Sequence, residues 1–136
     1  MKPRIRQVVL DTTDARALAE FYRQLFGLSY RPGDEAPASG EPDPNGKDWL
    51  VLRNDDGVSL AFQQVDELPR STWPESDIPQ QLHLDTTVPD VATLTTARDH
   101  ALALGATLLL DRTDDPDEPL YVFADPMGHP FCVFVG

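Results

Sequence analysis

The sequence predicts an α+β fold of two βαβββ modules, whose strongly curved mixed sheets enclose a cleft. One observation is an internal repeat. The segment QVVLDTTD at residues 7–14 is echoed by HLDTTVPD at residues 83–90, a little over half of the 136-residue chain later. The other is that an amphipathic helical pattern and three short strand patterns follow each copy. One module alone would leave the concave face of its sheet open, so the two are expected to pair.

The first module begins with a strand, predicted at residues 5–11 from its β-branched and aliphatic side chains. A helix follows, because apolar residues recur at helical spacing and Thr13 or Asp14 can cap its start, while Gly27 is typical of its end. Three strands complete the module, at residues 28–31, 49–53 and 58–65. The connection at residues 31–48 is rich in Pro and Gly, which is typical of either a lid or a disordered loop.

The second module repeats this order. It has a strand at residues 81–87 and a helix at residues 90–104 that ends at Gly105. Three further strands are predicted at residues 106–111, 119–124 and 130–135. The sequence therefore predicts one domain over residues 1–136, with module one at 1–65, a linker at 66–80 and module two at 81–136.

The charge balance limits the partners. The chain has 11 Lys and Arg residues against 23 Asp and Glu, a formal net charge of −12. No basic face is present to displace counterions from nucleic acid, and an anionic membrane surface would repel the chain. The single cysteine, Cys132, excludes an internal disulfide, and no signal peptide or spanning apolar run is visible. We expect a soluble cytoplasmic protein with no nucleic-acid or membrane partner.

Further motifs accompany the repeat: FYRQLFG at residues 21–27, LGA at 104–106 and DPMGHPF at 125–131. Together with the repeat they resemble the vicinal oxygen chelate (VOC) superfamily, which includes glyoxalase I, extradiol dioxygenases and bleomycin-resistance proteins. The resemblance covers essentially the whole chain, and the linker from Trp73 to Asp85 is similar to a glyoxalase-like subgroup. It implies the VOC (glyoxalase-like) fold and, because many relatives pair, a homodimer.

The resemblance also implies where a metal ion would bind. Metal-dependent members typically use a His and a Glu from the first and fourth strands of each module; the matching positions hold Gln7, Ala61, His83 and Cys132. A Zn, Ni, Fe or Mn site favours imidazole and carboxylate ligands, and a buried thiol resists losing its proton. No cofactor is therefore predicted. If a divalent metal does bind, we expect a rearranged site of His83, Asp85 and Cys132, because Asp85 points to the same strand face as His83.

The cleft is instead expected to hold a small organic ligand, because its floor is mostly apolar with a few polar groups. The expected ligand-binding residues are Gln7, Gln63, Trp73, His83, Asp85, Cys132 and Phe134. Some of these have a structural alternative. His83 can hydrogen-bond Gln7 across the cleft, Cys132 can be a packing residue, and Trp73 can anchor the linker instead of covering a ligand. The other histidines, His100 and His129, are expected at the surface.

Two classes of function follow. The first is metal-independent sequestration of a small aromatic or planar molecule, similar to the bleomycin-resistance branch. The alternative is a glyoxalase-like lyase, isomerase or dioxygenase with a degenerate or rearranged metal site. Its catalytic residue, if any, would be His83, which in a metal-free variant would act as a general base tuned by Asp85. An interaction module with an empty cleft is a third, plainer possibility.

Overall fold

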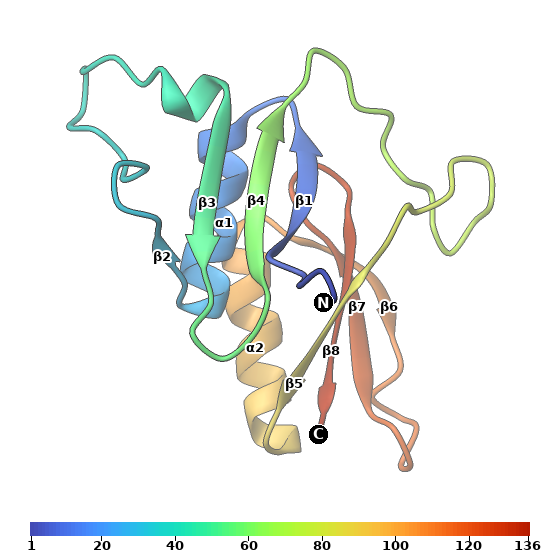
Figure 1. The fold of residues 1–136 in the computed structure, drawn as a ribbon. Helices are drawn as coiled ribbons and strands as arrows, with labels where there is room; N and C mark the ends of the chain where they lie inside the picture. The colour runs from blue at the N-terminus through green and yellow to red at the C-terminus, as the bar shows by residue number, and fades with distance from the viewer. The chain divides into compact units, whose positions relative to one another are not determined.

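Each half of the chain folds into a four-stranded mixed sheet with one α-helix, as the sequence predicts (Figure 1). The computed structural model describes all residues, 1–136, and divides them into two units, Met1–Leu68 and Pro69–Gly136. The elements of the first unit are β1 (Gln7–Thr12), α1 (Ala15–Phe26), β2 (Ser29–Tyr30), a 3-10 helix η1 (Asn45–Lys47), β3 (Trp49–Arg53) and β4 (Ser59–Gln64).

The elements of the second unit are β5 (Leu84–Val88), α2 (Val91–Leu104), β6 (Thr107–Asp111), β7 (Leu120–Ala124) and β8 (Pro130–Val135). The strand order is β1-β4-β3-β2 in the first sheet and β5-β8-β7-β6 in the second. In both sheets the first and last strands of the unit are parallel neighbours, and the other pairs are antiparallel. The predicted α+β class with two βαβββ modules is therefore confirmed.

Both helices begin and end where the sequence predicts. The Asp14 carboxylate accepts a hydrogen bond from the backbone N–H of Ala17 at 3.1 Å, and that of Asp90 accepts one from Thr93 at 2.7 Å. These bonds satisfy N–H groups that a first helical turn leaves without partners. At the C-terminal end of α1, Gly27 adopts a positive φ of 67°, a backbone conformation that favours glycine. Neither helix is long and apolar enough to cross a bilayer.

Each helix covers one face of its own sheet. In the first unit Tyr22 and Phe62 are fully buried and their rings stack 5.9 Å apart. In the second unit Phe123 and Phe131 are fully buried, with ring centroids 5.2 Å apart. Because side chains alternate along a strand, the residues between these core positions point to the other face of each sheet.

Residues 31–48 form an ordered loop that Arg16 of α1 holds in place. The Arg16 guanidinium donates hydrogen bonds to both Asp43 carboxylate oxygens, at 2.8 and 2.9 Å, and to the Asp34 carbonyl at 2.7 Å. It also lies over the Tyr30 ring, 5.0 Å from the centroid. The guanidinium lowers the pKa of the Asp43 carboxyl below its usual range. Of the two predicted alternatives, disorder is wrong; a role as a lid stays a prediction.

Candidate functional site

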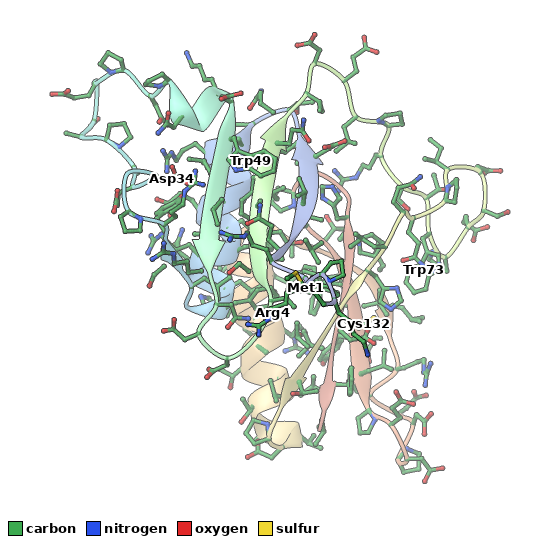
Figure 2. The ribbon with its side chains drawn as sticks, viewed as in Figure 1. Met1, Arg4, Asp34, Trp49, Trp73 and Cys132 are labelled. Atoms are coloured by element: carbon green, nitrogen blue, oxygen red, sulfur yellow. The ribbon has the colours of Figure 1, made fainter.

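Most of the predicted ligand-binding residues gather at the face of the second sheet that points away from Phe123 and Phe131. Asp85, Cys132 and Val122 lie in register on three neighbouring strands. We use the name apolar cluster for buried Leu120, Val122 and Cys132 together with the partly buried Trp73, Leu109 and Phe134 that pack on them. Cys132 comes from β8 and Trp73 from the segment before β5, both labelled in Figure 2. The predicted packing role of Cys132 agrees with its place in this cluster.

An aromatic pair lies beside the apolar cluster. The indole of Trp73 stacks on the imidazole of His83, with ring centroids 5.9 Å apart and an angle of 14° between the planes. Trp73 therefore anchors the linker on the sheet and also covers one side of His83. The side chain of His83 stays 37% exposed and that of Asp85 59% exposed, so solvent and small molecules have access to both.

His83 lies between two oxygen atoms. Its Nδ1 is 3.2 Å from Gln80 Oε1, and its Nε2 is 3.2 Å from Asp85 Oδ1. An amide oxygen only accepts hydrogen bonds, so with Gln80 oriented in this way Nδ1 donates. A neutral ring then presents the Nε2 lone pair to a carboxylate, which is a repulsive arrangement. A positive centre between Nε2 and Asp85, either a second ring proton or a cation, would make the contact favourable.

Cys132 completes a group of three potential ligands. One donor atom from each of His83, Asp85 and Cys132 lies within 4.8 Å of the other two. Burial raises the pKa of the Cys132 thiol to about 11, and the nearby negative charge of Asp85 adds to the shift. Without a cation, the side chain is therefore a neutral thiol at physiological pH. The structure brings together the three residues that the sequence singles out as a rearranged metal site.

The first unit holds the other two predicted ligand-binding residues. Gln7 is half-buried on β1 and Gln63 is exposed on β4. They lie on one face of the first sheet but toward opposite ends of it, because Gln7 pairs with Ser59 and Gln63 with Asp11. The predicted hydrogen bond between Gln7 and His83 would join two units, and it stays a prediction.

The four-ligand metal site of the metal-dependent VOC proteins does not fit this chain. At its four positions, Ala61 has only a methyl group, which is fully buried, and Gln7 has a neutral amide. At these four positions a divalent ion of the Zn, Ni, Fe or Mn type would find one imidazole and one thiol, fewer than the three good protein ligands that such sites generally keep. No carboxylate is present at any of the four positions to offset the charge of the ion.

Two features of the site were missed or misplaced by the sequence. Gln80, which orients His83, was not singled out; its position three residues before His83 was the available signal. The expectation that His129 lies at the surface is wrong. Its side chain is only 18% exposed, and its Nδ1 lies 2.7 Å from a carboxylate oxygen of fully buried Asp125. That pair closes the turn before β8, whereas His100 is exposed as expected.

A family model described as a glyoxalase-like domain matches residues 7–134. Among solved structures, the chain is similar to a glyoxalase/bleomycin resistance protein/dioxygenase family enzyme from Burkholderia phytofirmans PsJN. The TM-score is 0.72 and the sequence identity 17%, and the alignment covers 98% of both chains. No curated protein matches the chain.

Two further structures carry more specific names. The fosfomycin resistance protein FosX from Mesorhizobium loti aligns with a TM-score of 0.66 and 16% identity, over 100% of this chain and 94% of that one. Lactoylglutathione lyase from Agrobacterium tumefaciens aligns with a TM-score of 0.62 and 19% identity, over 99% and 95%. At these identities the likeness establishes the fold alone.

Proposed function

The chain belongs to the glyoxalase-like domain family, and we propose that it binds a small planar organic molecule beside the apolar cluster of its second unit, where Trp73, Leu109 and Phe134 are only partly buried. Binding would not require the metal ion of the metal-dependent VOC proteins, because three of the four expected His and Glu ligands are replaced in this chain, by Gln7, Ala61 and Cys132. The observation that carries the proposal is the stacked pair of Trp73 and His83 beside the apolar cluster.

The chemistry of this face suits a planar ligand. Aromatic rings favour offset stacking on other flat π-systems, and Trp73 already stacks in this way on an imidazole. Phe134 and Leu109 are only partly buried, so they extend the apolar surface beside Trp73. Small-molecule sites generally combine such a surface with a few polar groups that fix orientation.

The polar groups would orient the ligand. The exposed Asp85 carboxylate accepts hydrogen bonds, and His83 can donate once a proton resides on Nε2. The expectation that Gln7 and Gln63 of the first unit contact the ligand stays a prediction from the sequence. The homodimer stays a prediction.

A fluorescence titration tests the proposal. The chain has two tryptophans, so Trp49→Phe leaves Trp73 as the single indole reporter. In the presence of a chelator, a panel of planar aromatic compounds should include members that quench Trp73 fluorescence saturably. Trp73→Ala in the otherwise native chain should weaken binding, followed by calorimetry, by about tenfold, the loss expected from roughly 1.4 kcal/mol of stacking and contact.

A matched control is His100→Ala, which removes an exposed imidazole on α2 and should leave the affinity unchanged. If none of the compounds changes Trp73 fluorescence or produces heat in the folded protein, the proposal is wrong. Equal affinity in Trp73→Ala and the native chain would place the ligand elsewhere.

A second candidate is a lyase or isomerase reaction with His83 as general base. The observation that favours it is the placement of His83 Nε2 toward Asp85, with Nδ1 held by Gln80. General bases in enzymes are commonly positioned in this way, with the other ring nitrogen fixed by a partner. Turnover that disappears in His83→Ala while ligand binding persists would favour this candidate over sequestration.

A further inference from the structure

We propose that the second unit by itself binds a thiophilic divalent cation, of the Zn²⁺ or Cd²⁺ class, through His83 Nε2, an Asp85 carboxylate oxygen and Cys132 Sγ. The three ligand atoms come from one unit, and Asp85 is not one of the four VOC ligand positions. The site therefore differs from the four-ligand site, to which each module contributes two ligands.

The geometry needs only small adjustments. Zn²⁺ bonds nitrogen and oxygen at about 2.0 Å and sulfur at about 2.3 Å, so tetrahedral ligands lie roughly 3.5 Å apart. His83 Nε2 and Asp85 Oδ1 are already 3.2 Å apart, and all three donor atoms lie within 4.8 Å of one another. Because the Asp85 side chain is exposed, rotation about its own bonds can bring its carboxylate closer to Cys132 while His83 keeps its place.

The neighbouring residues Gln80 and Trp73 hold the His83 ring in an orientation suited to binding a metal ion. The Gln80 carbonyl oxygen accepts from Nδ1, which leaves the Nε2 lone pair directed toward Asp85. Metal-binding histidines are generally fixed through such a hydrogen bond on the other ring nitrogen. Trp73 stacks on the ring and restricts its rotation. A cation placed between Nε2 and the carboxylate would also remove the repulsion between these two groups.

The donor set selects the class of ion. On binding, the Cys132 S–H bond breaks, the sulfur forms a bond to the ion, and one proton is released to solvent. Thiolate and carboxylate together then balance the two positive charges. Hard ions such as Mg²⁺ and Ca²⁺ prefer oxygen ligands, whereas Zn²⁺ and Cd²⁺ accept thiolate. The second unit also has three arginines and no lysine against eleven Asp and Glu residues, which favours the approach of cations.

Titration of chelator-treated protein with Cd²⁺ and, separately, Zn²⁺ tests the site. Cd²⁺ should produce a thiolate-to-metal charge-transfer absorption that saturates at one ion per chain. Calorimetry with Zn²⁺ in buffers of different ionisation enthalpy should show the release of about one proton, because a thiol becomes a thiolate on binding. Mg²⁺ should neither produce heat nor compete.

Single substitutions measure how much each residue contributes to Cd²⁺ binding. His83→Ala and Cys132→Ala should each reduce Cd²⁺ binding to background, and Cys132→Ala should remove the charge-transfer absorption. Gln80→Leu leaves all three ligands in place and should weaken binding by about 10–100-fold, as for other partners of metal-binding histidines. His100→Ala and Asp114→Asn are matched controls on exposed residues of the same unit and should bind like the native chain.

Far-UV circular dichroism establishes that each variant is folded. The inference is wrong if the native chain shows no saturable charge-transfer absorption, or if folded His83→Ala binds Cd²⁺ as tightly as the native chain does. The proposed function uses His83 and Asp85 but does not depend on the metal ion. Planar-ligand binding is measured with chelator and metal binding without ligand, so either proposal can fail while the other holds.

Discussion

The two sheets share one strand order, but the faces that hold their potential ligands carry different chemistry. Equivalent positions of the two units are occupied by Gln7, Val9 and Ala61 in the first and by His83, Asp85 and Cys132 in the second. The first set contains one neutral amide and two side chains without donors; the second contains an imidazole, a carboxylate and a thiol. The repeat therefore preserves the core and the hydrogen-bonded ladders, while the potential ligands are concentrated in one unit.

The loop between the second and third strands also differs between the two units. In the first unit residues 31–48 join β2 to β3 and are held on α1 by Arg16. In the second unit residues 112–119 join β6 to β7, a shorter and acidic turn. There, Asp115 accepts the backbone N–H of Asp117, a local contact, rather than reaching back to the helix. In the first unit, polar contacts from the helix therefore hold a long loop, whereas the shorter loop of the second unit is held by contacts within itself.

The largest expected effect comes from giving the second unit the residues of the first. The triple variant His83→Gln, Asp85→Val, Cys132→Ala should lose both Cd²⁺ binding and the affinity for planar ligands down to background. The first unit shows that a sheet of this strand order accommodates these residues, so the free energy of unfolding should change by less than about 1 kcal/mol. Calorimetry and urea unfolding measure the two quantities. Retained Cd²⁺ binding would mean that the difference between the faces has no bearing on metal.

The next effect concerns the loop. Arg16→Ala removes two charged hydrogen bonds to Asp43 and one to the Asp34 carbonyl. It should lower the free energy of unfolding by about 2–3 kcal/mol, the range for hydrogen bonds to charged groups. Limited proteolysis should then cleave within residues 31–48.

Arg53→Ala, at an exposed position of the same unit, should change stability by less than about 0.5 kcal/mol. If Arg16→Ala is no more sensitive to protease than this control, the loop is held by its other contacts, such as the buried Asp34 carboxylate that accepts the Val51 N–H.

The smallest expected effect is on the pH dependence of stability, and it comes from a difference between the N-terminal caps of the two helices. The hydroxyl and the backbone N–H of Thr93 lower the pKa of Asp90 below its usual 3.8, whereas α1 has Ala17, without a hydroxyl, at the equivalent place. A lowered folded-state pKa gives stability that is present above the unfolded value and is lost as the pH falls through the folded value. Asp90→Asn should therefore lose less stability than the native chain on acidification below pH 3.8. Urea midpoints at neutral and acidic pH measure this, and identical pH profiles would contradict it.

Local signals accounted for much of the fold. Asp14, Gly27, Asp90 and Gly105 mark the helix ends because caps act on backbone groups within a few residues. The state of the loop at residues 31–48 could not be predicted in this way. The loop contacts the helix through Arg16, which is 27 residues from Asp43 along the chain, and no periodicity reports such a contact.

The candidate site was predicted in its residues but not in its details. The strand expected from residue 81 begins at Leu84, so His83 precedes the ladder and is held by Gln80 and Trp73 instead. Alternation along a strand suggested that His83 and Asp85 share a face; it could not show that Gln80 leaves Nε2 directed at the carboxylate. The position of His129 is not predicted because the turn of residues 125–128 brings its imidazole onto the Asp125 carboxylate, and the sequence does not show that this carboxylate is buried.

The parallel pairing of the first and last strands in each unit has a consequence for assembly. Because β1 lies beside β4 and β5 beside β8, each ladder is completed within its own half of the sequence (Figure 1). Two chains can therefore trade their C-terminal halves through the segment between β4 and β5 without breaking a hydrogen bond of either sheet. Domain swapping of this kind would leave the strand pairing of both units intact.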